Sequence, residues 1–187
     1  MKYRWYYLSL LLAAVVFAGI LSGCGPRSVG TTTTIALAGE NVTFTYPESY
    51  TAPPDGPGDN AVTYRHFVGD PADIKADRMI FIETQPISLS DSAETLLDQD
   101  LGNILQSGPD FKLIKRTTRK IDGQTASLVA FTQSFPTVAL TSQTTTTWVA
   151  YLVRGDTIWQ LGVMTNADLG DAAEQDFKTF TSSFKFE

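Results

Sequence analysis

The chain has 187 residues and carries 14 lysines and arginines against 20 aspartates and glutamates, a net charge of −6. This length suits one domain with a substantial core and is too short for two. The negative charge repels phosphate backbones and argues against nucleic acid as a partner. Cys24 is the only cysteine, so no disulfide can form within the chain and the fold must depend on its apolar core.

Residues 1–23 have the three parts of a secretory signal peptide. Two basic residues come first, the apolar run Leu8–Ile20 follows, and the small residues Ser22 and Gly23 precede Cys24. Two alternatives remain, namely an ordinary cleaved signal with a coincidental cysteine and an uncleaved membrane anchor. The apolar core Leu8–Leu21 has 14 residues, fewer than the roughly 20 that span a bilayer. Its length therefore favours a signal peptide over an anchor.

The end of this segment, Leu21-Ser22-Gly23-Cys24, resembles a bacterial lipobox. The resemblance implies that Cys24 receives a diacylglyceryl thioether and becomes the first residue of the mature chain. Two acyl chains hold a protein firmly at a membrane. We therefore expect a protein anchored by lipid at the extracytoplasmic face of the cell membrane. Residues 1–23 hold two of the positive charges and no acid, so the mature chain has 12 positive and 20 negative charges, a net of −8.

After Cys24 the chain is rich in glycine and threonine and contains no acid before Glu40. This composition predicts a flexible spacer from Gly25 to about Thr34. The expected organisation is a signal peptide at 1–23, lipidated Cys24 and a threonine-rich linker at 24–39, and one domain at 40–187.

The first half of the domain is predicted to be mostly strand. Val42–Tyr46 alternates with the period of a strand and stops at Pro47, and residues 53–58 form a loop rich in proline and glycine. Strands at Ala61–Val68 and Arg78–Thr84 follow. Asp91-Ser92-Ala93-Glu94 then matches a capping box, which predicts a helix that begins there and ends near Gly108-Pro109. Its apolar positions share one face: Ala93, Leu96, Leu97, Leu101, Ile104 and Leu105.

Two hairpins are predicted next. Asp122-Gly123 is a strong hairpin turn between strands 111–121 and 124–134, and Gly155-Asp156 joins strands 144–153 and 157–165. In this register both faces of the second hairpin carry apolar side chains. One face has Trp148, Ala150, Leu152, Trp159, Leu161 and Val163, and the other has Val149, Tyr151, Val153, Ile158 and Met164. Both faces must therefore be covered.

The last segment supplies a cover. Leu169, Ala173, Phe177, Phe180 and Phe184 recur every three or four residues, which predicts a second amphipathic helix. A sheet that is apolar on both faces, with two such helices, predicts an α+β fold in which an antiparallel sheet has helices on both faces.

The order of these elements resembles the PsbP-like domain, a superfamily that includes the Ran-binding Mog proteins and several bacterial lipoprotein families. The resemblance spans about residues 40–187. The local cues are Phe44–Tyr50, Ile121–Ala126 and the final Ser183-Phe184-Lys185-Phe186. It implies an antiparallel α/β/α sandwich and an accessory or binding role. Fold alone does not identify the partner.

The sequence offers little for catalysis. His66 is the only histidine, and no set of ligands shows the spacing of a metal site, so no metal or other cofactor is expected. We interpret His66 as a strand histidine that is hydrogen-bonded or faces solvent. A serine triad lacks its Gly-x-Ser-x-Gly motif. Asp91, Glu94, Asp98 and Asp100 are interpreted as capping residues and solvated charges on the exposed face of the helix. No enzymatic activity is expected.

One positively charged cluster interrupts the acidic background. Within nine residues of one strand the chain has five basic side chains: Lys112, Lys115, Arg116, Arg119 and Lys120. They suit contact with anionic lipid headgroups or an acidic partner. They equally suit the protection of a sheet edge against aggregation, which is the commoner use of such residues.

Two functions are compatible with these features. The first is a non-enzymatic accessory protein, anchored by lipid, that docks an unidentified protein partner at the membrane. The second is a carrier or sensor that holds a small apolar or amphipathic ligand between the sheet and a helix, which requires a cavity of several hundred Å³. Trp148, Trp159, Tyr151 and Phe177 are candidates to line such a pocket, although their spacing favours the core.

Overall fold

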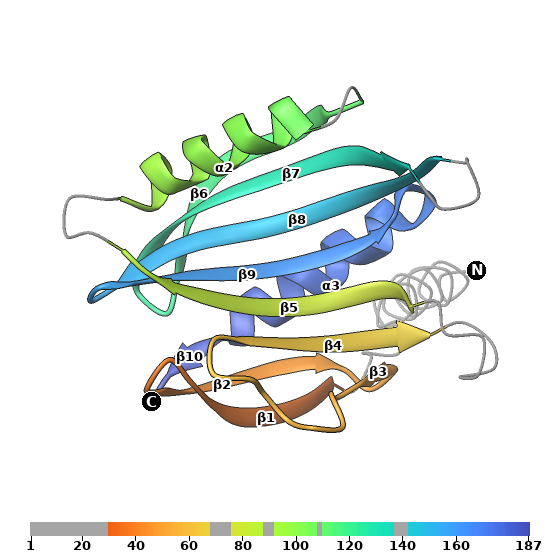
Figure 1. Cartoon of the computed structure of the whole chain (residues 1–187). Helices are drawn as coiled ribbons and strands as arrows, with labels where there is room; N and C mark the ends of the chain where they lie inside the picture. Colours follow the sequence, from red (N-terminus) through yellow and green to blue (C-terminus); the bar gives the residue numbers. More distant parts are fainter. Residues whose placement is uncertain (1–29, 68–75, 88–91, 108–109, 137–141) are drawn as a thin grey trace, which may run out of the picture.

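A computed structural model describes residues 30–67, 76–87, 92–107, 110–136 and 142–187. Cys24 and the signal peptide lie outside these residues, so their assignment stays a prediction. The described residues form ten strands and two α-helices (Figure 1). In chain order the elements are β1 (Gly30–Leu37), β2 (Glu40–Pro47), β3 (Tyr50–Thr51), β4 (Ala61–Phe67), β5 (Ala76–Pro86), α2 (Ala93–Ser107), β6 (Lys112–Ile121), β7 (Gln124–Pro136), β8 (Ser142–Arg154), β9 (Thr157–Asn166), a 3₁₀ turn (Ala167–Leu169), α3 (Gly170–Ser183) and β10 (Lys185–Phe186).

The strands form two antiparallel sheets. The large sheet has seven strands in the order β3-β4-β5-β9-β8-β7-β6, and the small sheet has the order β1-β2-β10. Both predicted hairpins are present, as β6–β7 and β8–β9. At the first turn Asp122 and Gly123 have φ angles of 46° and 77°. Positive φ at both central residues is what a two-residue hairpin turn requires.

Strand β1 corrects the predicted linker. Residues 30–37 pair with β2 along their whole length, so they belong to the folded domain and not to a linker. Threonine is β-branched and favours strands, unlike the glycine and serine of flexible linkers. On the exposed side, the Thr34 and Thr43 hydroxyl oxygens lie 2.6 Å apart. On the inner side Ile35 and Leu37 are buried.

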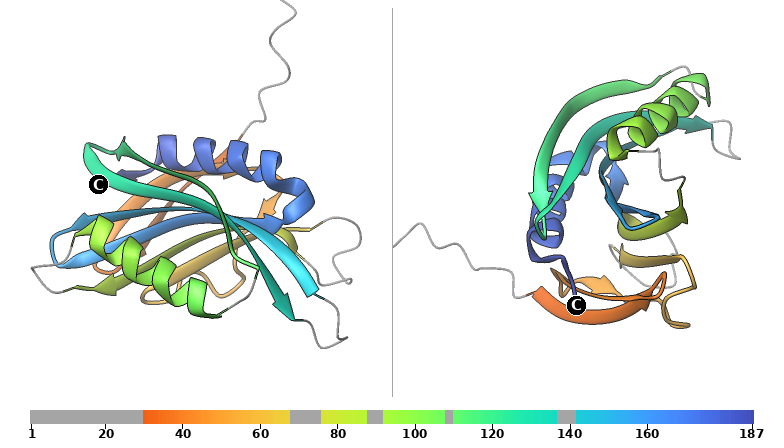
Figure 2. Two further views of the ribbon diagram at one scale, coloured as in Figure 1. Left: turned by 90° about the horizontal axis from the view of Figure 1, so that it is seen from above. Right: turned by 90° about the vertical axis from the view of Figure 1, so that its left-hand side faces the viewer.

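The two helices cover opposite faces of the large sheet (Figure 2). Helix α3 packs against β8 and β9 and also against β2, so it lies between the two sheets. The main core gathers there around Phe44, Phe177 and Phe180. Helix α2 packs on the other face through Leu97 and Leu101. The predicted fold class, an antiparallel sheet with helices on both faces, is therefore confirmed.

The ends of the helices differ slightly from the prediction. In α2 the Ser92 hydroxyl accepts a hydrogen bond from the Thr95 backbone N–H at 3.1 Å, so Ser92 is the N-cap and the helix begins at Ala93. Asp91, the predicted cap, lies outside the described residues, as do the side chains of Ile104 and Leu105. Helix α3 ends at Ser183, and the chain then extends into β10, which pairs with β2. Phe184 is buried although it lies beyond the helix.

Candidate functional site

The basic strand β6 is the outermost strand of the large sheet. A β-bulge interrupts its pairing with β7: Leu113 lies opposite Phe131 and Lys115 opposite Ala130, which leaves Ile114 without a partner residue. Leu113 is 48% exposed and Ile114 49% exposed, and they are the large hydrophobic side chains exposed within the described part of the chain. The edge of the sheet therefore presents an apolar pair next to its positive charges.

The structure does not bring the five basic residues into one patch. Arg116 faces α2, where its guanidinium lies 2.6 Å from Asp98 and 3.4 Å from Glu94. Lys120 is on the same side and donates a hydrogen bond to the Thr125 hydroxyl at 2.6 Å.

The other side of β6 faces α3. Here Lys115 and Arg119 line a hollow of about 120 Å³ with Trp148 and Phe177. Among the residues that the structure describes, no ion pair involves Lys112, Lys115 or Arg119. Two of the five basic residues thus make polar contacts within the domain, and the other three form no ion pair with the described residues.

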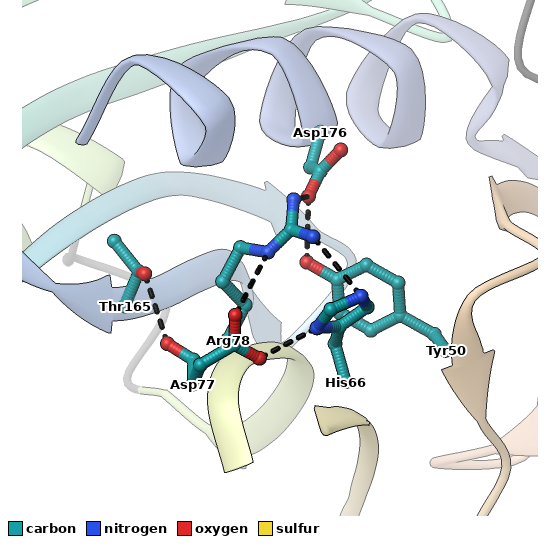
Figure 3. A network of polar contacts seen from close by, with 6 residues as sticks. All are labelled: Tyr50, His66, Asp77, Arg78, Thr165 and Asp176. Carbon is teal, nitrogen blue, oxygen red and sulfur yellow. Dashed lines mark hydrogen bonds and ion pairs between the residues drawn. The ribbon is translucent and has the colours of Figure 1, made fainter. Parts of the chain in front are cut away.

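A buried polar network lies near the edge of the large sheet that is farthest from β6 (Figure 3). It joins four strands to α3 through Tyr50 (β3), His66 (β4), Asp77 and Arg78 (β5), Thr165 (β9) and Asp176 (α3). One oxygen of Asp176 accepts hydrogen bonds from Arg78 Nη1 and from the Tyr50 hydroxyl, each at 2.7 Å. The four charged or imidazole side chains are only 11% to 17% exposed.

His66 is fixed in one tautomer by this network. Its Nε2 atom lies 3.1 Å from Arg78 Nη2, and its Nδ1 atom lies 2.5 Å from Asp77 Oδ1. Because arginine has only donors, Nε2 accepts, and the ring carries its proton on Nδ1 and donates it to Asp77. Both ring nitrogens are therefore occupied. Of the two alternatives for this strand histidine, hydrogen-bonded or facing solvent, the structure shows the first.

Tyr50 behaves as a donor in the same network. Burial, and then the negative charge of Asp176, raise the pKa of its hydroxyl well above the ordinary value. The phenol keeps its proton and holds β3 to α3 through Asp176. Arg78 Nε makes no hydrogen bond within the described residues and lies 3.7 Å from Asp77 Oδ2. The other contacts of the network join elements of the domain to one another, so we interpret its role as positioning these elements. Sequence reasoning missed Asp176, although an acid in the apolar stripe of α3, next to Phe177, was a usable signal.

A groove lies between α2 and the large sheet, with a volume of about 410 Å³. Helix α2 packs on β7 and β8, and the groove extends beside it over β4, β5 and β9. Its apolar lining includes three aromatic and two methionine side chains: Phe81, Phe131, Tyr151, Met79 and Met164. Glu83 and Asp100 are the charged residues in the lining.

This groove corrects one prediction. Asp100 was expected on the solvated face of its helix, but it lines the groove and accepts a hydrogen bond from the Tyr151 hydroxyl. It directly precedes Leu101 and follows Leu97 by three positions, the two residues that pack on the sheet, so it lies at the border of the buried face of α2.

The four candidate pocket residues are mainly core, as their spacing indicated. Trp159 and Phe177 are core residues on the α3 side, where Trp148 is partly buried. Tyr151 is buried in the core on the α2 side and also lines the groove.

The described residues contain no group of three or more His, Cys, Asp and Glu side chains placed to hold a metal ion. Among the helices that the structure describes, none has both the length and the apolar character needed to cross a membrane.

Comparison with known proteins finds similarity in structure and none in sequence. No protein-family model matches the chain, and no curated protein matches it. The solved structure of the Saccharomyces cerevisiae Ran-binding protein Mog1p is 12% identical, has a TM-score of 0.57, and aligns over 84% of this chain and 96% of its own. The PsbP protein of the cyanobacterium Synechocystis is 16% identical, with a TM-score of 0.55 over 90% of this chain and 100% of its own.

A third similar structure is LpqN of Mycobacterium tuberculosis, described as involved in cell envelope biogenesis. It is 14% identical, with a TM-score of 0.54 over 84% of this chain and 91% of its own. Identities this low establish architecture and leave activity open. The resemblance inferred from short sequence cues is confirmed at the level of the fold: the chain has the Mog1/PsbP-like fold, a large antiparallel sheet with helices packed against it.

Proposed function

We propose that this protein is a non-enzymatic binding module, anchored through lipidated Cys24 at the extracytoplasmic face of the cell membrane, and that the β6 edge docks its partner. The observation that carries the docking proposal is the exposed pair Leu113 and Ile114 at an unpaired sheet edge. Lys112, Lys115 and Arg119 next to this pair favour an acidic partner surface. The fold supports a binding role, since Mog1p is a Ran-binding protein and LpqN is involved in envelope biogenesis.

Edge protection explains only part of this surface. Lysines and a bulge discourage another strand from pairing with β6. Two large apolar side chains, each half exposed, have the opposite effect, because contact with a second surface would remove them from water. The combination of an apolar centre and charged surroundings is typical of a protein interface. We therefore favour docking over protection alone.

The experiment is photo-crosslinking of the membrane-anchored chain in its source cells, with p-benzoylphenylalanine at Ile114. The matched control carries the crosslinker at Thr31, an exposed residue of β1. We expect a discrete protein adduct at position 114 only. It should disappear in the Lys115→Glu/Arg119→Glu variant and persist in Arg65→Glu/Lys185→Glu, which reverses the same number of exposed charges elsewhere. Adducts that are equal at both sites, or insensitive to charge reversal, would contradict docking through β6.

A second function, ligand binding, is favoured by a separate observation. The groove between α2 and the sheet has a volume of about 410 Å³, within the range of roughly 300–1,000 Å³ typical of small-molecule sites. The site lies on the other side of the large sheet from the main core, so it could be filled without opening the core.

A further inference from the structure

The floor of the groove is shaped by an aromatic ring lying on a glycine. Phe81 on β5 is directly opposite Gly162 on β9. A Cβ atom at residue 162 would lie 2.1 Å from Phe81 Cζ and 2.4 Å from Cε1, far closer than atoms can approach. The absence of a side chain at Gly162 therefore lets the phenyl ring lie down on the sheet, which leaves space above it for another molecule.

The lining is also polarised by charge. Glu83 and Asp100 are its acids, and no lysine, arginine or histidine is among the described residues that line it. Burial is the largest cause that raises the pKa of the Tyr151 hydroxyl, but the charges of Asp100 and then Glu83 raise it further. Both carboxylates therefore act on the same region of the groove floor, and their field favours a positive charge there.

The chemistry of the remaining lining suits the apolar part of such a ligand. Met79 and Met164 have flexible, polarisable side chains that adapt to different shapes. A flat phenyl ring attracts a cation placed over its face. A neutral ligand could at most donate a hydrogen bond to the two carboxylates, without the attraction between opposite charges, and an anion would be repelled by them.

We propose that the groove binds a small organic cation, an ammonium or guanidinium attached to an apolar body, with the cation between Phe81, Glu83 and Asp100. The proposal rests on the second candidate function, ligand binding. It is independent of the lipid anchor and of docking through β6.

The test compares three probes of similar size: 2-phenylethylammonium, 2-phenylethanol and 3-phenylpropionate. Each is titrated against the full lipidated chain in nanodiscs of zwitterionic lipid, with empty nanodiscs subtracted, by isothermal calorimetry and ligand-observed NMR. We expect the cation to bind about thirtyfold more tightly than the alcohol, since two favourable charge contacts and one cation–π contact each contribute about threefold.

Variants then locate the effect. Glu83→Gln and Asp100→Asn should each weaken the cation about threefold and leave the alcohol unchanged. Phe81→Leu should weaken the cation about threefold. Glu48→Gln, which removes an exposed charge outside the groove, is the matched control and should change nothing.

Three outcomes would overturn the proposal in distinguishable ways. Equal binding of all three probes, or tighter binding of the anion, would reject the cation and leave ligand binding intact. If no probe binds at millimolar concentration, both ligand binding in the groove and its preference for a cation are rejected. If Glu48→Gln weakens cation binding as much as Glu83→Gln does, the preference for a cation comes from the overall negative charge of the chain and not from the groove.

Discussion

At the scale of single residues, Asp176 holds the network of Figure 3 together. One of its oxygens accepts from both Arg78 and Tyr50, and the carboxylate is almost buried. Removing one partner of a buried charged pair is costly, because the other charge is left without compensation in a medium that solvates it poorly. Asp176 therefore stabilises the packing of α3 against β3 and β5.

Asp176→Ala should lower the free energy of unfolding by about 3 kcal/mol, since it leaves the buried Arg78 with only its longer ion pair to Asp77 and the Tyr50 hydroxyl without its acceptor. Urea unfolding followed by circular dichroism measures this change. The control is Gln175→Ala, an exposed neighbour on the same helix, where a change within about 0.5 kcal/mol is expected. Equal effects of the two substitutions would show that the network contributes little to stability.

Tyr64 gives the fold a dependence on alkaline pH. Burial raises the pKa of its hydroxyl to about 12, from 10.0, and the neighbouring Tyr46 adds to this, while a hydrogen bond with Thr33 lowers it. Between these two values the unfolded chain loses the proton and the folded chain keeps it. The stability that the buried Tyr64 hydroxyl contributes is therefore fully present below pH 10 and is lost as the pH rises through about 12.

Tyr64→Phe should reduce this alkaline loss by about 2 kcal/mol. The measurement is a series of urea unfolding curves from neutral pH to pH 12 for both proteins. Some loss should remain in the variant, because the pKa values of Tyr50 and Tyr151 are also raised by burial. Parallel curves for the two proteins would show that Tyr64 does not titrate in this range.

At the scale of elements, β1 is a structural part of the domain. Leu37 is 2% exposed and belongs to the core cluster beneath α3. Leu37→Ala should lower the free energy of unfolding by about 3 kcal/mol, as for other buried leucines. Thr31→Ala, on the exposed part of the same strand, is the control. If residues 30–37 formed a linker, neither substitution would matter, and urea unfolding separates the two cases.

The elements that sequence predicted well are those defined by their own residues. Alternation of apolar side chains, with the turns at Asp122-Gly123 and Gly155-Asp156, predicted the two hairpins correctly. The same alternation assigned Trp148 and Val149 to opposite faces, as the structure has them. The linker predicted at the threonine run was wrong because threonine is common both in linkers and in strands. Only the pairing of these residues with β2 decides between the two.

The candidate sites were harder to predict because their residues meet only in the folded chain. Tyr50 and Asp176 are 126 positions apart in sequence, and no local pattern connects them. The groove depends on how far α2 extends over the sheet and on the contact between Phe81 and Gly162. In contrast, the composition of the basic strand made it visible in the sequence. Which of its side chains face α2 and which face α3 depends on the register of β6 with its bulge, and this the sequence did not predict.

At the scale of the whole molecule, the strand directions place the start of β1 and the start of β6 at the same end of the fold. Antiparallel pairing connects Gly30 with Pro47, Tyr50 with His66, and Lys112 with Thr132, and the intervening pairs keep these residues at one end. A tether that leads into Gly30 would therefore hold Leu113 and Ile114 at the end of the domain nearer to the membrane. This arrangement is the reason to expect a membrane-associated partner for β6.

The anchor itself is tested at this scale. Cys24→Ser should move the protein from the membrane fraction to the soluble fraction, whereas the natural protein should stay with membranes through a high-salt wash, because acyl chains are not displaced by salt. Mass spectrometry of the N-terminal peptide identifies the modification directly. Membrane retention of the serine variant, or an unmodified thiol at Cys24, would reject the lipid anchor.

The central strand β2 has β1 on one side and β10 on the other, so residues far apart in the chain meet on it. Phe184, just before β10, stacks on Phe44 of β2. A growing polypeptide therefore cannot close the interior around Phe44 until Phe184 and β10 have left the ribosome. Folding of this domain is expected to wait for the synthesis of these residues, long after its first strands have emerged.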